Sequence, residues 1–150
     1  MKKIILILCL LPLLVGCNKI EIENQNENTS KQVEEISNMK VLIDNIEYMI
    51  NLEDNETVDN LKSKLPLDLN MNDLNNNEKY VYLDFNLPTN EKKVNTINKG
   101  DVMLFGSNCL VIFYKTFNAT YSYTKIGHID NLDISHNNSI NVRLLNDNII

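Results

Sequence analysis

A polar and aromatic segment near the middle of the chain has the residue types that a ligand-binding rim needs. Asn77-Glu78-Lys79-Tyr80 follows an asparagine-rich stretch and precedes two more aromatic residues, Tyr82 and Phe85. A carboxylate and an ammonium group beside aromatic rings can border a pocket for a peptide or a small molecule. The competing interpretation is a solvated turn with core aromatic residues behind it.

A second aromatic cluster follows some thirty residues later. It comprises Phe113, Tyr114, Phe117, Tyr121 and Tyr123. These rings are either core and barrel wall or a stacking surface for a ligand. Taking both clusters together, we predict six ligand-binding residues: Glu78, Lys79, Tyr80, Tyr82, Phe113 and Tyr123.

The sequence offers no pattern typical of a metal, a cofactor or a nucleophile. Cys109 lies in an apolar stretch, where a lone cysteine is typically a small buried hydrophobic residue. His128 lies in an apolar segment and is expected to be a hydrogen-bonded structural residue, whereas His136 is expected to be solvated. The spacing of these residues predicts no metal site, and there is no glycine-rich phosphate loop. We therefore predict no cofactor and assign no catalytic residue.

The first residues have the organisation of a secretory leader. Lys2 and Lys3 precede an apolar run over residues 4–14. This run is shorter than the roughly 20 residues that a membrane-spanning helix needs. A charged start, a short apolar run and small residues predict a signal peptide over residues 1–16.

The leader ends in Leu14-Val15-Gly16-Cys17, which resembles the lipobox of bacterial lipoproteins. The resemblance implies that the Cys17 sulfur receives a diacylglyceryl group and that the chain is cut before Cys17. More than one acyl chain gives stable membrane attachment. We therefore expect a lipid-anchored protein on the outer face of a membrane. The alternative is an ordinary secretory signal followed by a chance cysteine.

Residues 17–38 are polar and contain no aromatic residue, which predicts a disordered tether between the anchor and a domain over residues 39–147. The formal net charge is −6, and loss of Lys2 and Lys3 with the leader would make it −8. An acidic chain is poorly suited to binding nucleic acid or anionic lipid, so we expect no nucleic-acid partner and attachment through the lipid alone.

The domain that must position the aromatic clusters has mainly β patterns. Alternating apolar residues on both sides of Asp44-Asn45 predict a β-hairpin. Asp54 or Asn55 can cap a helix that carries Val58, Leu61 and Leu65 and stops at Pro66.

A short strand is expected at Leu67 and Leu69, followed by a polar loop over residues 72–77. Residues 89–98 read as a polar connection, residues 102–105 as a strand, and residues 109–114 as a strand buried on both faces. One or two strands over residues 121–129 and a closing strand from Ile140 complete the pattern. Many short strands with one or two short helices predict a closed β-barrel or a compact sandwich.

Several separate motifs, in order, resemble the small bacterial cyclophilin-like domains. They are Leu52-Glu53-Asp54-Asn55, Leu65-Pro66-Leu67, Asn77-Glu78-Lys79-Tyr80, Leu87-Pro88-Thr89-Asn90, the Gly100 to Gly106 segment, Leu110-Val111-Ile112-Phe113-Tyr114 and the Ser122 to Ile129 segment. The resemblance implies a mainly β fold, namely a small closed eight-stranded barrel with one or two short helices.

True cyclophilins are peptidyl-prolyl isomerases that act on the prolyl amide with an arginine, helped by a glutamine and a histidine. Here the only arginine, Arg143, lies in the closing strand, and Tyr123 stands four residues before Gly127, where the resemblance would place histidine. We therefore expect a binding module for a peptide or a small molecule. A weak isomerase with non-standard residues is the alternative, and a structural or adhesive envelope protein is a third class.

Overall fold

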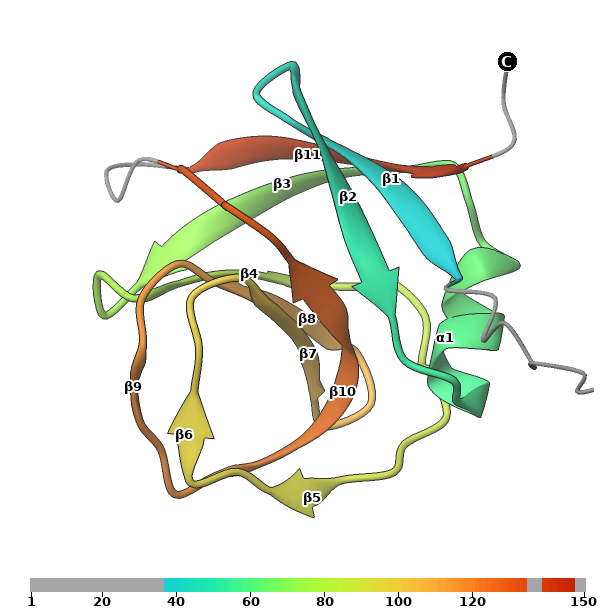
Figure 1. The fold of residues 1–150 in the computed structure, drawn as a ribbon. Coiled ribbons are helices and arrows are strands. Elements are labelled where there is room, and N and C mark those ends of the chain that lie inside the picture. Colours follow the sequence, from blue (N-terminus) through green and yellow to red (C-terminus); the bar gives the residue numbers. More distant parts are fainter. Residues whose placement is uncertain (1–36, 135–138, 148–150) are drawn as a thin grey trace, which may run out of the picture. The chain divides into compact units, whose positions relative to one another are not determined.

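The computed structural model describes residues 37–134 and 139–147 (Figure 1). The predicted signal peptide, Cys17, His136 and the tether up to residue 36 lie outside the described residues. The strands are β1 (Asn38–Ile43), β2 (Ile46–Leu52), β3 (Leu67–Leu74), β4 (Glu78–Tyr82), β5 (Lys92–Lys93), β6 (Thr96–Ile97), β7 (Asp101–Phe105), β8 (Cys109–Phe113), β9 (Phe117–Asn118), β10 (Ser122–Ile129) and β11 (Ile140–Asn146).

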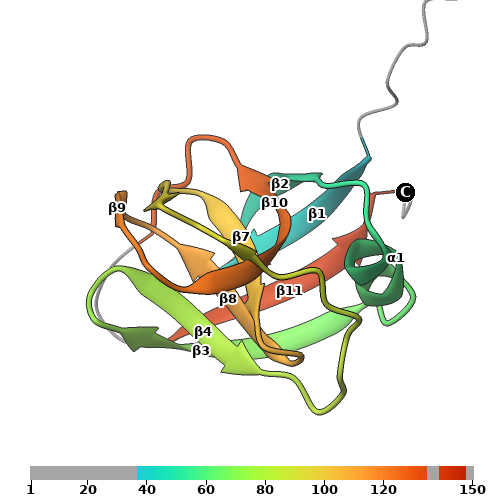
Figure 2. The same cartoon turned by 90° about the horizontal axis from the view of Figure 1, so that it is seen from below.

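Eight of these strands form a closed antiparallel barrel. Their order is β2-β1-β11-β3-β4-β8-β7-β10, and β10 pairs back onto β2 through Gly127, His128 and Ile129. Figures 1 and 2 show the ring of strands from two directions. Closure removes the exposed sheet edges that an open sheet would leave. The prediction of a small, mainly β, closed barrel is confirmed.

The β1–β2 hairpin illustrates how local sequence sets the register. Asp44 and Asn45 both have positive φ, at 47° and 69°, as a two-residue type I′ turn requires. The turn places Met39, Val41 and Ile43 on the inner face of β1, where each is almost fully buried. The predicted hairpin is therefore present.

Helix α1 (Glu56–Lys62) is the one helix in the described ranges, and it is too short and too polar to cross a membrane. The Asn55 side chain caps it by accepting a hydrogen bond from the Val58 amide at 3.0 Å. The prediction extended this helix to Leu65, whereas it ends at Lys62. Because a residue before proline is biased away from helical geometry, Leu65 leaves the helix ahead of Pro66.

Strand β3 is longer than the sequence suggested. The predicted loop over residues 72–77 is wrong for its first three residues, because β3 continues to Leu74 and only residues 75–77 form the turn. Asn70 and Asn72 point to solvent while Met71 between them is fully buried. A half-exposed strand can carry many asparagines on its outer face. The many polar residues of β3 therefore concealed its alternation of inward and outward side chains.

Two apolar clusters lie on opposite sides of the wall that contains β8. The larger one fills the barrel and includes Ile50, Leu104 and Ile112. The smaller one lies outside it and comprises Val94, Ile97, Met103, Cys109, Val111, Phe113 and Tyr123. Strand β8 serves both clusters, since all five of its residues are buried, which confirms the prediction for this strand.

The outer cluster is partly covered by the connection over residues 89–98 and by the small β6–β9 sheet. The sequence predicted a polar connection here; the segment also buries Val94 and Ile97 and includes the short strands β5 and β6. The outer face beside β4 stays open.

Candidate functional site

Strand β4 presents two chemically different faces. Because side chains alternate along a strand, Glu78, Tyr80 and Tyr82 point outward while Lys79 and Val81 point into the barrel. The antiparallel register sets Glu78 opposite Phe113, Tyr80 opposite Val111 and Tyr82 opposite Cys109 on β8. The outward residues of β4 therefore continue the outer apolar cluster.

An open pocket of about 490 Å³ lies over this outer face. Its volume falls in the range of roughly 300–1,000 Å³ that is usual for small-molecule sites. The turn after β3, the strands β4, β7, β8 and β10, and the segment around β9 all contribute to it. Its lining residues are Leu74, Asn75, Asn77, Glu78, Tyr80, Tyr82, Phe105, Cys109, Val111, Phe117, Tyr121 and Tyr123.

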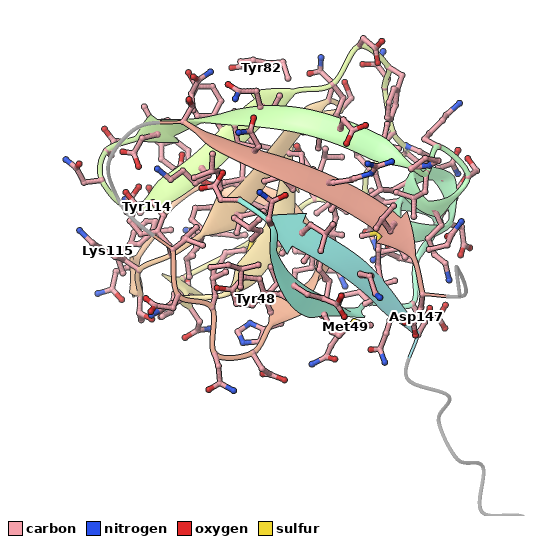
Figure 3. All side chains as sticks on the ribbon, turned by 90° about the horizontal axis from the view of Figure 1, so that it is seen from above. Tyr48, Met49, Tyr82, Tyr114, Lys115 and Asp147 are labelled. Atoms are coloured by element: carbon pink, nitrogen blue, oxygen red, sulfur yellow. The ribbon has the colours of Figure 1, made fainter. Side chains whose placement is uncertain are left out.

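Half of the twelve residues that line the pocket are aromatic. Tyr80 and Tyr82 meet edge to face with ring centroids 5.9 Å apart. On the other side, Phe105 lies 5.6 Å from Tyr123 and 6.2 Å from Tyr121. Tyr82 and Tyr121 are 67% and 62% exposed, so these rings stand at the mouth (Figure 3 shows Tyr82 outside the ribbon, well apart from Tyr114). Such rings can stack on a planar or apolar ligand.

Glu78 is the one charged residue among the described residues that line the pocket. Burial, and next the negative charge of Asp73, raise the pKa of its carboxyl above the ordinary value of 4.5. Its carboxylate forms no hydrogen bond or ion pair with any described residue. Burial, and next the charge of Glu78, also raise the pKa of Tyr123 to about 12, so that phenol is neutral at pH 7.

Lys79 does not line the pocket. Its ammonium nitrogen is fully buried on the inner face of the wall and donates a hydrogen bond to Asp73 Oδ2 at 2.8 Å. The Tyr114 hydroxyl donates to the same oxygen at 2.6 Å. Burial works against ionisation of Asp73, but these two hydrogen bonds and the charge of Lys79 outweigh it and lower the pKa of the carboxyl.

Cys109 and His128 are both part of the framework. Cys109 is buried in β8 at the base of the pocket, and burial raises the pKa of its thiol. The His128 Nδ1 lies 3.0 Å from Asp101 Oδ1, and the other carboxylate oxygen of Asp101 accepts from the Asn98 amide. Within residues 37–134 and 139–147, no three histidine, cysteine, aspartate or glutamate side chains group together as metal ligands would.

A second hollow of similar volume, also about 490 Å³, lies along β1, β3 and β11. It contains no aromatic residue and is lined by Leu42, Asp44, Asn45, Asp68, Leu69, Asn70, Asn141, Val142 and Arg143. Its charges are already compensated in part, since Arg143 Nε lies 3.4 Å from Asp68 Oδ1. We regard the aromatic pocket as the better candidate because it combines rings with an unpaired carboxylate.

The structure brings four of the six sequence-predicted residues to one pocket: Glu78, Tyr80, Tyr82 and Tyr123. Phe113 lies beneath it, fully buried, with its ring 5.6 Å from that of Tyr123. Lys79 lies on the opposite side of the barrel wall, because side chains alternate between the two faces along β4.

Phe105, Phe117 and Tyr121 also line the pocket and were not among the predicted site residues. Phe105 is joined to the site only through pairing of β7 with β8, where it stands opposite Cys109. The sequence offered one signal for Phe105: it is a hydrophobic residue beside the Gly106 turn, and it lies on the same face of β7 as the buried Met103, two positions earlier.

Comparisons with known proteins address the whole domain. A family model described as the cyclophilin-like family matches residues 41–145. The solution structure of a hypothetical protein from Archaeoglobus fulgidus superposes with a TM-score of 0.56 at 17% identity, over 73% of this chain and 93% of the other. That likeness is one of fold. No curated protein matches the chain.

Proposed function

Since the chain belongs to the cyclophilin-like family, we propose that its barrel is a binding module for a peptide or a small molecule. The observation that carries the proposal is the aromatic pocket over β4 and β8. It joins a wall of rings to a single carboxylate, in a volume suited to a metabolite or to one or two side chains of a peptide.

The second candidate is a weak peptidyl-prolyl isomerase with non-standard residues. An apolar, ring-lined pocket is a surface on which a prolyl ring can rest, and tyrosine hydroxyls at its mouth can donate hydrogen bonds. Among the residues that the structure describes, no arginine, glutamine or histidine lines the pocket; Arg143 lies on β11, and His128 Nδ1 lies 3.0 Å from Asp101 Oδ1. An isomerase reaction here would therefore depend on the tyrosines.

A prolyl-peptide isomerisation assay on the full chain, run beside a binding screen of peptides and small molecules, separates the two candidates. We expect binding without acceleration of isomerisation. Acceleration that is lost in Tyr80→Phe but kept in the control Lys99→Gln, an exposed residue away from the pocket, would establish the isomerase instead.

We also propose that the module is held on the outer face of a bacterial membrane by lipid on Cys17. The support is the order of charged start, apolar run, small residue and cysteine at the N-terminus. Two or more acyl chains would give stable attachment.

Changing Cys17 tests the anchor directly. Cys17→Ser is expected to abolish incorporation of labelled lipid and to leave an uncut precursor. The matched control is Cys9→Ser, inside the leader, which is expected to leave labelling and processing unchanged. Normal processing and membrane retention of Cys17→Ser would contradict the anchor.

A further inference from the structure

Within the described part of the chain, the charge of Glu78 in the aromatic pocket has no compensating partner. No lysine or arginine is among the lining residues of the pocket, while Glu78 lines it and Asp73 lies near enough to act on the carboxyl of Glu78. Lys79, which follows Glu78 in the sequence, points into the barrel and donates a hydrogen bond to Asp73. A partly buried carboxylate without a partner is unfavourable unless a positive group approaches it.

A second acceptor near Glu78 also lacks a partner. The side-chain oxygen of Asn77, in the turn that borders the pocket, is buried and accepts no hydrogen bond within the described part of the chain. A buried acceptor without a hydrogen bond lowers the stability of the fold. Because this oxygen is enclosed, a ligand in the open pocket would meet the carboxylate of Glu78 and not Asn77 Oδ1.

The rings point to the same kind of ligand. Tyr80, Tyr82, Phe105, Tyr121 and Tyr123 surround the cavity, and the faces of aromatic rings attract cations. The net charge of −6 adds a weak long-range attraction for positive ligands. A neutral apolar ligand would use the rings and leave the carboxylate of Glu78 without a partner.

From this arrangement we propose that the pocket binds a small organic amine in its protonated form, with the ammonium group at Glu78 and its carbon skeleton against the rings. The inference rests on the proposed binding function and narrows its ligand class. We favour a free small molecule over a lysine side chain because a cavity of about 490 Å³ can enclose a whole metabolite-sized amine.

The test compares two probes of the same size and shape that differ in charge. The full chain, kept in a non-ionic detergent, is titrated at pH 7 with cyclohexylammonium and with cyclohexanol while its amide NMR signals are followed. The amine is expected to bind at least tenfold more tightly and to shift signals of β4, β8 and β10. A capped lysine, N-acetyl-lysine N-methylamide, is expected to bind more weakly than cyclohexylammonium.

Two variants assign the preference to a residue. Glu78→Gln keeps the shape of the side chain and is expected to bring the two affinities within about twofold, with cyclohexanol unaffected. Glu53→Gln, an exposed carboxylate elsewhere in the chain, is the matched control and should keep the full preference.

The outcomes separate this inference from the function on which it rests. Equal affinities of the two probes at the pocket would overturn the amine inference and leave the binding module standing. The same conclusion would follow if neither probe bound but the screen found a neutral ligand. Tighter binding of the capped lysine would overturn the choice of a free amine. Failure of both probes and of the whole screen would overturn both proposals.

Discussion

Glu78 and Lys79 are neighbours in the sequence but lie on opposite sides of one barrel wall. Lys79 is fully buried and bonded to Asp73, which also accepts from Tyr114. Glu78 faces the aromatic pocket and has no partner among the residues that the structure describes. The ammonium group of Lys79 is paired within the fold, whereas the carboxylate of Glu78 faces the pocket, where a ligand could pair with it.

The difference shows that two charged neighbours in a sequence can have different surroundings: Lys79 is part of the fold, and we propose Glu78 for ligand binding. Burying an ammonium group is tolerated only when it is paired and hydrogen-bonded, which the Asp73 network achieves. Placing a carboxylate among rings without a partner lowers stability and is typical of a binding site. The following predictions test this division.

The largest effect is expected on the inner side. Asp73→Asn would leave the Lys79 ammonium buried without its counter-charge, so we expect the free energy of unfolding to fall by roughly 2–3 kcal/mol in urea titrations. The matched control is Asp68→Asn on the same strand, whose exposed pair with Arg143 should contribute about 0.5 kcal/mol or less. Equal effects of the two substitutions would contradict a structural role for the inner pair.

A smaller effect of opposite sign is expected on the outer side. Glu78→Gln removes a charge that the pocket disfavours, so stability at pH 7 should be unchanged or higher by about 0.5 kcal/mol. A clear loss of stability in this variant would show that Glu78 has a structural partner. The proposed difference between the roles of Glu78 and Lys79 would then be wrong.

The pH dependence of stability should distinguish the two carboxyls. The pKa of Asp73 is lowered, so its contribution is full above pH 3.8 and is lost as the pH falls through the lower folded value. The pKa of Glu78 is raised, so its contribution is full below pH 4.5 and is lost as the pH rises through the higher folded value. At neutral pH, Asp73→Asn should be less stable than the parent chain and Glu78→Gln equally or more stable, because only the ionised form of Glu78 is disfavoured in the folded state. Both differences should shrink at low pH, where the two carboxyls are protonated in the parent chain, and differences of the same sign at pH 7 would contradict the assignment.

The smallest effect on stability is expected at the pocket mouth. Tyr82 is 67% exposed, so Tyr82→Leu should change the free energy of unfolding by no more than about 0.5 kcal/mol. The same change should weaken ligand binding several-fold, because it removes a ring from the wall. Phe113→Leu, beneath the pocket, is the contrast: it should reduce stability by more than 1 kcal/mol through lost core packing. A strongly destabilised Tyr82→Leu would place that ring in the core.

Sequence reasoning reached the barrel because β1 and β11 alternate with period two and β8 is a continuous apolar run. It failed at β3, where Asn70 and Asn72 on the solvent side made a strand look like a loop. It also treated residues 77–80 as one rim, although alternation sends Lys79 inward. Phe117 belonged to the predicted aromatic cluster but was not chosen as a site residue, and Phe105 comes to the pocket through the pairing of β7 with β8, which is remote from β4 in the sequence.

The central claim is that the outer face of β4 and β8 is the ligand site. Mapping amide NMR shifts on the full chain against an unbiased set of small molecules and proline-containing peptides tests it most directly. The account predicts shifts concentrated at Glu78, Tyr80, Val111 and Tyr123 around the aromatic pocket. Shifts concentrated instead at Leu42, Asn70 and Arg143, around the polar hollow of similar volume, would contradict it.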